Sequence, residues 1–290
     1  MGVAARSRKT REALMAYAML APLLVVFGLF AYYPFVRLID FALNQKFTNS
    51  DETEFVGFKG VWDVLSSNDF SDGLWITVKF MLYTVPAGLV IGVVLATIAN
   101  RRLRGIKIFQ TIFSSTIASS VAVASVVFTT LINRQVGYFK DVDFISLSSQ
   151  GGALRGVALA AIWGNIGLTF VIVLAGMQAI PDEINEAAML DGYGPIRRFF
   201  KVTVPMISPT LLFLAVVLVV QALQAYAQID ILTNGGPAKS TETLLYKIAQ
   251  LQGRTDLQTG ASMALGLFLL TLVVSAGQYL MLNKRVHYDN

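Results

Sequence analysis

Six long stretches of mostly apolar residues dominate the pattern of hydrophobic and polar positions along the chain. A helix crosses the hydrocarbon core of a bilayer in roughly 20 apolar residues, and each stretch meets or approaches that length. They run near Leu14–Val36, Ile76–Ala99, Ile106–Ile132, Ala153–Ile180, Ser208–Gln228 and Ala261–Leu282. The pattern predicts an all-α, polytopic membrane protein with about six transmembrane helices, folded as a single transmembrane domain over residues 1–290.

Composition supports a lipid environment. The chain has 290 residues, 55% hydrophobic and only 14% charged, with a mean hydropathy of +0.61. Soluble domains usually carry about 25% charged residues. There is no cysteine, which excludes a disulfide framework and a Cys-ligated metal site. The single histidine, His287, is expected to be a solvated residue of the tail.

The basic residues predict the orientation in the membrane. Lys and Arg concentrate in short cytoplasmic loops of membrane proteins. An inside N-terminus places more than half of the 23 Lys and Arg residues on the cytoplasmic side, including the segment 1–13 and both ends of the chain. The long first outer loop, about 37–75, is rich in Asp and Glu, and we expect it to form a solvated hairpin or a short helix.

Several sequence signatures of chemistry are absent. The chain has neither a G-x-x-x-x-G-K-[ST] phosphate loop nor an H-E-x-x-H motif. Acidic residues, which mark proton relays in transporters, are missing from the apolar cores; Asp230 comes nearest. An intramembrane enzyme and a secondary carrier are alternatives of other classes, but the first lacks catalytic side chains and the second would predict internal repeats. We expect no catalytic site and no metal site, so the energy for any transport must come from another chain.

The segment 181–207, between the fourth and fifth stretches, is the most informative. Pro181 and Asp182 can begin a helix, and the run from Glu186 favours one. Gly192, Gly194 and Pro195 then break it, and a second helix begins near Ile196. The spacing predicts helix, sharp turn and helix at the inner membrane face. An ordinary connector lying on the lipid headgroups would have the same spacing and stays an alternative.

This segment resembles the EAA loop of binding-protein-dependent ABC importer permeases, which reads EAA, three residues, G, nine residues, I-x-L-P. The matching residues are Glu186, Ala187, Ala188, Asp191, Gly192 and Pro205, with Val202 and Val204 in place of Ile and Leu. The resemblance implies that the loop couples to a separate ATPase, which would bind ATP and Mg²⁺, while this chain holds no cofactor. It also implies a second homologous permease, two ATP-binding subunits and an extracytoplasmic solute-binding protein as partners.

The likeness extends over nearly the whole chain. Phe55-Val-Gly-Phe58 and Leu232-Thr-Asn-Gly-Gly-Pro237 are similar to segments of the maltose-type carbohydrate permeases, the second to an outer loop whose glycines allow a tight turn. Within that group the chain resembles the first permease subunits of sn-glycerol-3-phosphate and glycerophosphodiester importers, in 191–201 and 284–288. A permease for a di- or oligosaccharide of the maltose or trehalose type is the alternative. Ser114-Ser115, where Leu-Pro is common in the group, is a departure on the third stretch.

Polar side chains at membrane depth are expected to face the interior of the bundle. We predict a substrate site from Trp163, Asn165, Gln221, Gln224 and Tyr226, since amides and aromatic faces suit sugars and polyols. Gln221, Gln224 and Gln228 are spaced to share one face of a helix. The same residues could instead hold helices together. With no Lys or Arg expected inside the membrane, a phosphate would need its countercharge from the partner subunit or from the ligand.

Overall fold

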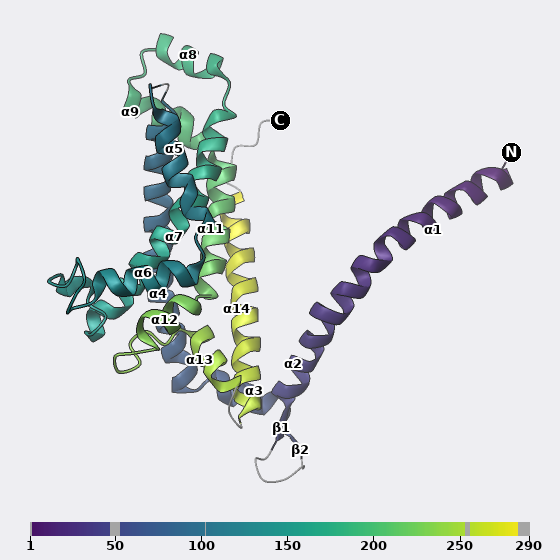
Figure 1. Cartoon of the computed structure of the whole chain (residues 1–290). Helices are drawn as coiled ribbons and strands as arrows, with labels where there is room; N and C mark the ends of the chain where they lie inside the picture. Colours follow the sequence, from purple (N-terminus) through teal and green to yellow (C-terminus); the bar gives the residue numbers. More distant parts are fainter. Residues whose placement is uncertain (1, 47–52, 102, 253–255, 284–290) are drawn as a thin grey trace. The chain divides into compact units, whose positions relative to one another are not determined.

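The computed structural model describes residues 2–46, 53–101, 103–252 and 256–283, and nearly all of them are helical (Figure 1). The chain forms two compact units, each described by itself. The first consists of residues 1–65 and 251–265, and the second of residues 66–250 and 266–290. The last helix runs through both units. The sequence-based assignment of residues 1–290 to one membrane domain stays a prediction.

The first unit combines a long helix with a hairpin. Its elements are α1 (Gly2–Phe27), a π turn η1 (Gly28–Tyr32), α2 (Tyr33–Leu43), β1 (Asn44–Lys46), β2 (Thr53–Phe55), α3 (Gly57–Leu65) and the start of α14 (Leu257–Asn283). The strands pair antiparallel, with Asn44 opposite Phe55. The amide of Gln258 on α14 donates to the carbonyl of Ala42 over 3.2 Å. The segment 37–75, for which a hairpin or a short helix was expected, therefore contains the paired strands β1 and β2 as well as the short helix α3.

The second unit carries the remaining membrane-length helices and the loops at their ends. Its elements are α4 (Asn68–Ala99), α5 (Ile106–Ser114), the 3₁₀ turn η2 (Ser115–Ala118), α6 (Val121–Ile132), η3 (Asp143–Ile145), α7 (Gln150–Gln178), α8 (Asp182–Leu190), α9 (Pro195–Arg198), a π turn η4 (Phe199–Thr203), α10 (Val204–Met206), α11 (Ser208–Leu223), α12 (Ala227–Thr233), α13 (Leu244–Gln252) and the continuation of α14.

The expected six spans are present, but two of them are bent. Four helical segments of the described chain are long and apolar enough to cross a membrane: Met15–Leu43, Asn68–Ala99, Gln150–Gln178 and Leu257–Met281. Two further spans are broken pairs. Ile106–Ala118 meets Val121–Ile132 at 104°, and Pro195–Met206 meets Ser208–Leu223 at 70°. The predicted count of about six is therefore correct, with each bent pair counted as one span.

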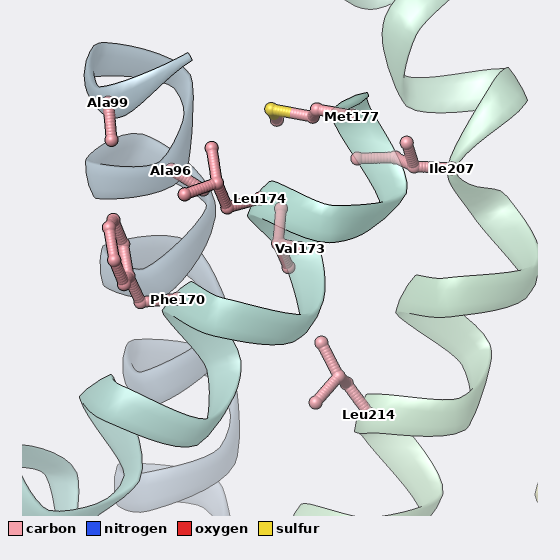
Figure 2. Close-up of a cluster of buried hydrophobic side chains, with 8 residues drawn as sticks. All are labelled: Ala96, Ala99, Phe170, Val173, Leu174, Met177, Ile207 and Leu214. Carbon is pink, nitrogen blue, oxygen red and sulfur yellow. The ribbon is translucent and has the colours of Figure 1, made fainter. Parts of the chain in front are cut away.

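Small residues allow α4, α7 and α11 to pack closely in the second unit. Figure 2 shows the buried cluster that they share: Ala96, Ala99, Phe170, Val173, Leu174, Met177, Ile207 and Leu214. A Cβ at Gly92 of α4 would lie 2.3 Å from Cγ2 of Thr169 on α7, so only glycine permits this approach. Small residues at helix contacts are the usual basis of packing in lipid, where apolar burial gives little drive for association.

Both π turns end two residues before a proline. In η1 the N–H of Tyr33 donates to the carbonyl of Gly28, and Pro34 follows. In η4 the N–H of Val204 donates to the carbonyl of Phe199, and Pro205 follows. Proline donates no N–H, and its ring crowds the carbonyl four residues back. A turn widened by one residue makes room for the ring, and the chain continues as helix beyond it.

Candidate functional site

The loop from α8 to α9 has the predicted helix–turn–helix form. Asp182 and Glu183 lie in the first turn of α8, where a carboxylate is favoured by the positive end of the helix dipole. The helix ends at Leu190, Gly192 has a φ of +76°, and α9 begins at Pro195. Figure 1 shows this loop at one end of the second unit, with α12 and α13 toward the other end.

Two backbone hydrogen bonds close the turn. The N–H of Gly192 donates to the carbonyl of Met189, and the N–H of Tyr193 donates to the carbonyl of Ala188, each over 3.0 Å. This pair of bonds is the Schellman motif, which needs a left-handed residue after the helix. A Cβ built on Gly192 meets nothing within 4 Å. The glycine is therefore required for its backbone angle and not for space.

Apolar side chains project from this loop. Ala188 is buried, whereas the side chains of Met189 and Leu190 are 61% and 90% exposed. Ile196 of α9 and Phe200 of η4 are exposed as well. Glu186, Ala187 and Asp191 are exposed, and Pro205 is half-buried. The matched EAA residues thus belong to one short connector with an exposed apolar surface. Met189 and Leu190 form part of that surface, although the motif alone did not indicate them.

A cavity of about 490 Å³ lies among the helices of the second unit. Asn165 of α7 lines it together with Gln221, Gln224 and Gln228, and Thr84, Thr116, Ser119 and Ser125 add hydroxyl groups. Its apolar walls include Phe80, Ile117 and Leu168. None of the described residues that line it is Lys, Arg, Asp or Glu. Such a mixture of amides, hydroxyls and apolar walls matches an uncharged polyhydroxyl group.

The backbone that places the three glutamines at the cavity differs from the predicted continuous helix. We expected Gln221, Gln224 and Gln228 to share one face of a continuous helix, and this is wrong. Helix α11 ends at Leu223, Gln224 has φ −100° and ψ 21°, and Gln228 belongs to α12. The chain turns at Ala225 and Tyr226, and this turn brings all three amides to one cavity.

Two of the predicted substrate residues lie outside the cavity lining. The ring of Trp163 packs against Phe128, with centroids 5.9 Å apart. Tyr226 stacks on Tyr246 at 6.0 Å. Tyr246 donates its hydroxyl to Oδ1 of Asn234 over 2.7 Å, and burial, followed by the charge of Asp230, raises the pKa of Tyr246 above 10.0. Of the five residues predicted, Asn165, Gln221 and Gln224 are brought together.

The break in the third span brings further polar groups to the cavity. Ser114, Ser115 and Thr116 each donate a hydroxyl to a carbonyl of the preceding turn. Ser120 then accepts from the N–H of Val123 and caps α6. Gly167 of α7 fits against this break, because a Cβ there would lie 2.3 Å from Oγ1 of Thr116. The pair Ser119-Ser120 was the available signal for a new helix start.

The loop after α12 is tied together by side chains. Asn234, Gly235, Ala238 and Lys239 have positive φ, whereas Gly236 does not, so only one of the two expected glycines is left-handed. The hydroxyls of Thr233 and Thr241 lie 2.8 Å apart, and that of Thr241 also lies 3.1 Å from the carbonyl of Gly236. We call residues 234–243 the outer loop. In Figure 1 it lies toward the end of the second unit opposite α8.

Several membrane-length helices, an exposed apolar connector and a polar internal cavity are typical of a membrane transport subunit. The chain belongs to the family described as the binding-protein-dependent transport system inner membrane component, whose model matches residues 85–288. It is therefore a multi-pass membrane protein and a transport subunit, and not an enzyme in its own right. Residues 284–288, which carried part of the resemblance, lie outside the described residues.

Particular relatives refine the placement within the family. The chain is 31% identical over 288 residues to the sn-glycerol-3-phosphate transport system permease protein UgpA of Shigella flexneri, and equally to that of Escherichia coli strain UTI89, covering 96% of this chain and 97% of each relative. The fold matches a bacterial alginate ABC transporter in complex with an alginate pentasaccharide-bound periplasmic protein, with a TM-score of 0.81 and 19% identity over 94% of this chain and 96% of that one. A second alginate importer structure matches with a TM-score of 0.79, 21% identity and coverage of 96% and 98%.

Proposed function

We propose that this chain is a permease subunit of an ATP-driven importer for glycerol-3-phosphate, its diesters or related polyols. The observation that carries the importer assignment is the loop from α8 to α9, in which a Schellman turn at Gly192 presents exposed Met189 and Leu190. An apolar patch at the end of a membrane unit favours a protein partner. The phosphate-ester class is supported by the two UgpA relatives, which cover nearly the full chain.

The proposal assigns energy supply to other chains. A separate ATPase binds ATP and Mg²⁺, and its closure moves α8 through Glu186, Ala187, Ala188, Asp191, Gly192 and Pro205. Two such ATP-binding subunits, a second homologous permease and an extracytoplasmic solute-binding protein complete the assembly. This chain contributes half of the path and holds no cofactor. The family description, which names binding-protein-dependent transport, supports this division of roles.

The proposal also assigns an orientation. Both termini, residues 101–107 and the loop from α8 to α9 face the cytoplasm, and the outer loop faces the other side. The distribution of Lys and Arg supports this arrangement. The chain has no cysteine, so a single cysteine at position 239 can be labelled from one side at a time. Labelling from the cytoplasmic side alone would reverse the proposed topology.

The cavity of about 490 Å³ is the proposed substrate path. Its amides can hydrogen-bond the hydroxyls of a polyol, and Asn165, Gln221 and Gln224 are the residues that we assign to this contact. An oligosaccharide is the second candidate, because the described lining of this cavity carries no cation for a phosphate. Trp163 and Tyr226 support the neighbouring walls through Phe128 and Tyr246.

Uptake by the assembled transporter in proteoliposomes tests the proposal. Replacing Gln221 with Leu removes a substrate hydrogen bond, which costs about 1–3 kcal/mol, and should weaken uptake of labelled glycerol-3-phosphate about ten- to hundredfold. Basal ATP hydrolysis and assembly should be retained because the coupling loop is unchanged. Parallel uptake of a labelled disaccharide distinguishes the two substrate classes.

The matched control is Gln135→Leu, since Gln135 is exposed and outside the cavity lining. It should leave uptake unchanged. If Gln221→Leu abolishes assembly instead, the amides hold helices together and the substrate path lies elsewhere.

A further inference from the structure

A second cavity, of about 630 Å³, differs from the first in charge. It lies among the starts of α4 and α7, the outer loop and α13, all within the second unit. Its described lining contains four cationic side chains, Lys79, Arg155, Lys239 and Lys247, and two carboxylates, Asp69 and Asp72. Trp75, Ile76, Tyr83 and Leu154 provide apolar and aromatic walls. The excess of positive charge favours an anionic ligand.

One of the four cations, Lys247, forms an ion pair within the cavity wall. Nζ of Lys247 lies 3.2 Å from Oδ1 of Asp69 and donates to the backbone carbonyl of Asp69 over 2.9 Å. The side chain of Lys247 is only 10% exposed, so this pair is a fixed part of the wall. In the described part of the chain, no carboxylate forms an ion pair with Lys79, Arg155 or Lys239.

Two of the remaining cations, Arg155 and Lys79, are positioned by uncharged groups. Arg155 donates from Nε to the carbonyl of Phe144 over 2.9 Å, and its guanidinium lies 4.0 Å from the centre of the Phe144 ring. Nζ of Lys79 lies 5.0 Å from the centre of the Trp75 ring. A neutral carbonyl and aromatic faces position a cation but leave its countercharge to a ligand. Lys79 lies on α4 and Arg155 on α7, so each of these two helices brings a cation to the cavity. The expectation that no Lys or Arg lies inside the membrane stays a prediction.

Two independent features of the outer loop are typical of a segment that contacts a ligand. Ala238 and Lys239 both have positive φ, at 47° and 61°, although neither is glycine. Such backbone strain costs about 1–3 kcal/mol for each residue and gathers at ligand-contacting segments. Oγ of the adjacent Ser240 is buried and has no hydrogen-bond partner among the described residues, and Ser240 lines the cavity. An unpartnered hydroxyl in a cation-lined cavity can donate to an anionic oxygen.

We propose that this cavity is an anion site for the phosphate group of a phosphomonoester or phosphodiester, with Lys79, Arg155, Lys239 and Oγ of Ser240 as its ligands. The inference rests on the proposed phosphate-ester substrate. It places the countercharge for the phosphate at the end of the unit opposite the coupling loop, while the amide cavity receives the hydroxyl-bearing part. The phosphate would be held here before or during transfer of the ligand into the amide cavity.

The local charge can be measured without transport. Ala238 lines the cavity and is exposed, and Ala238→Cys keeps the same Cβ in a chain with no other cysteine. In the assembled transporter, the rates of modification by an anionic and a cationic methanethiosulfonate of similar size are compared. The anionic reagent should react faster. Adding Lys79→Gln should lower the ratio of the two rates about fivefold, as loss of one unit charge at several ångströms predicts.

Lys140→Gln in the same background is the matched control, because Lys140 is exposed and does not line the cavity. It should leave the ratio unchanged. sn-Glycerol-3-phosphate should slow modification in detergent-purified transporter, and a soluble short-chain phosphatidylglycerol tests whether a lipid headgroup occupies the same site. Protection by either compound supports a phosphate-ester site and identifies the source of its ligand.

Three results would overturn the inference: equal rates for the two reagents, a ratio unaffected by Lys79→Gln, or protection only by the solute-binding protein, which would make the cavity a protein contact. A phosphate-responsive site in a transporter that takes up only a disaccharide would instead support the anion site and overturn the proposed substrate.

Discussion

The loop from α8 to α9 around Gly192, which we propose as the coupling loop, and the outer loop around Gly235 reverse the chain by similar turns with different packing. Both turn the chain through a left-handed glycine, with φ of +76° and +81°. At Gly192 a Cβ would meet nothing within 4 Å, whereas at Gly235 it would lie 2.8 Å from Cε1 of Tyr246. The coupling loop is closed by two backbone bonds, whereas the outer loop has backbone bonds, such as that from the N–H of Thr241 to the carbonyl of Gly235, and threonine side-chain bonds in addition.

This difference indicates which contacts stabilise the conformation of each loop. Around Gly235 the outer loop is packed by the chain itself, because the Tyr246 ring and the Glu242 side chain lie against the backbone and the hydroxyls of Thr233 and Thr241 bond to each other. The coupling loop keeps Met189 and Leu190 exposed, and no atom lies within 4 Å of where a Cβ of Gly192 would be. A segment with few buried contacts has low local stability. Burial of Met189 and Leu190 against a partner would add the apolar contacts that stabilise it. We therefore expect substitutions in the outer loop to lower the stability of the chain more than substitutions in the coupling loop.

The largest effect on the stability of the chain is expected for Gly235→Ala. The new methyl group would lie 2.8 Å from the Tyr246 ring and 2.9 Å from Cγ of Glu242. Overpacking costs about 1–3 kcal/mol, and the left-handed backbone adds about 1–2 kcal/mol. Thermal unfolding of the purified chain in detergent should show a clearly lowered midpoint. Gly277→Ala, where a Cβ meets nothing within 4 Å, should not lower it; equal midpoints for the two variants would remove the distinction between the loops.

A smaller effect is expected for Thr243→Val. Thr243 is fully buried, and its hydroxyl donates to the carbonyl of Ala225 over 2.9 Å. Valine has nearly the same shape but leaves that carbonyl without its partner, at a cost of about 1–3 kcal/mol. The same unfolding assay measures it. Thr271→Val is the control, because the hydroxyl of Thr271 donates to the carbonyl of Leu267, one turn back in its own helix.

The smallest effect on the chain itself is expected for Gly192→Val, at about 1–2 kcal/mol, because only the backbone is strained. Its effect on uptake should be much larger, since the Schellman turn sets the direction of α8 toward the ATPase. Gly192→Asn should keep most of the uptake, because Asn adopts left-handed φ more readily than Val. The assay compares uptake and ATP hydrolysis in proteoliposomes. Wild-type coupling by Gly192→Val would show that the turn geometry is unimportant.

The comparison also shows which parts of the molecule the sequence could predict. The six spans and the loop at Gly192 follow from local patterns: apolar length, and a glycine between helix-forming runs. The turn at Gln224–Tyr226 could not be seen, because Gln221, Gln224 and Gln228 have good helical spacing and no glycine or proline lies among them. Its cause is tertiary: Thr243 donates to Ala225, and Tyr246 stacks on Tyr226. The cation-lined cavity was missed for a similar reason, since Lys79, Arg155 and Lys239 come from distant segments.

The π turns at Gly28–Tyr32 and Phe199–Thr203 have an evolutionary consequence. An i→i+5 turn holds one residue more than the α-helical turn on either side of it. An inserted residue would otherwise rotate every later side chain by about 100° around the helix axis. Confined to a π turn, the extra residue leaves the two flanking helices with their own contacts. Relatives that differ by one residue at these two places can therefore keep the same membrane-facing and interior-facing sides.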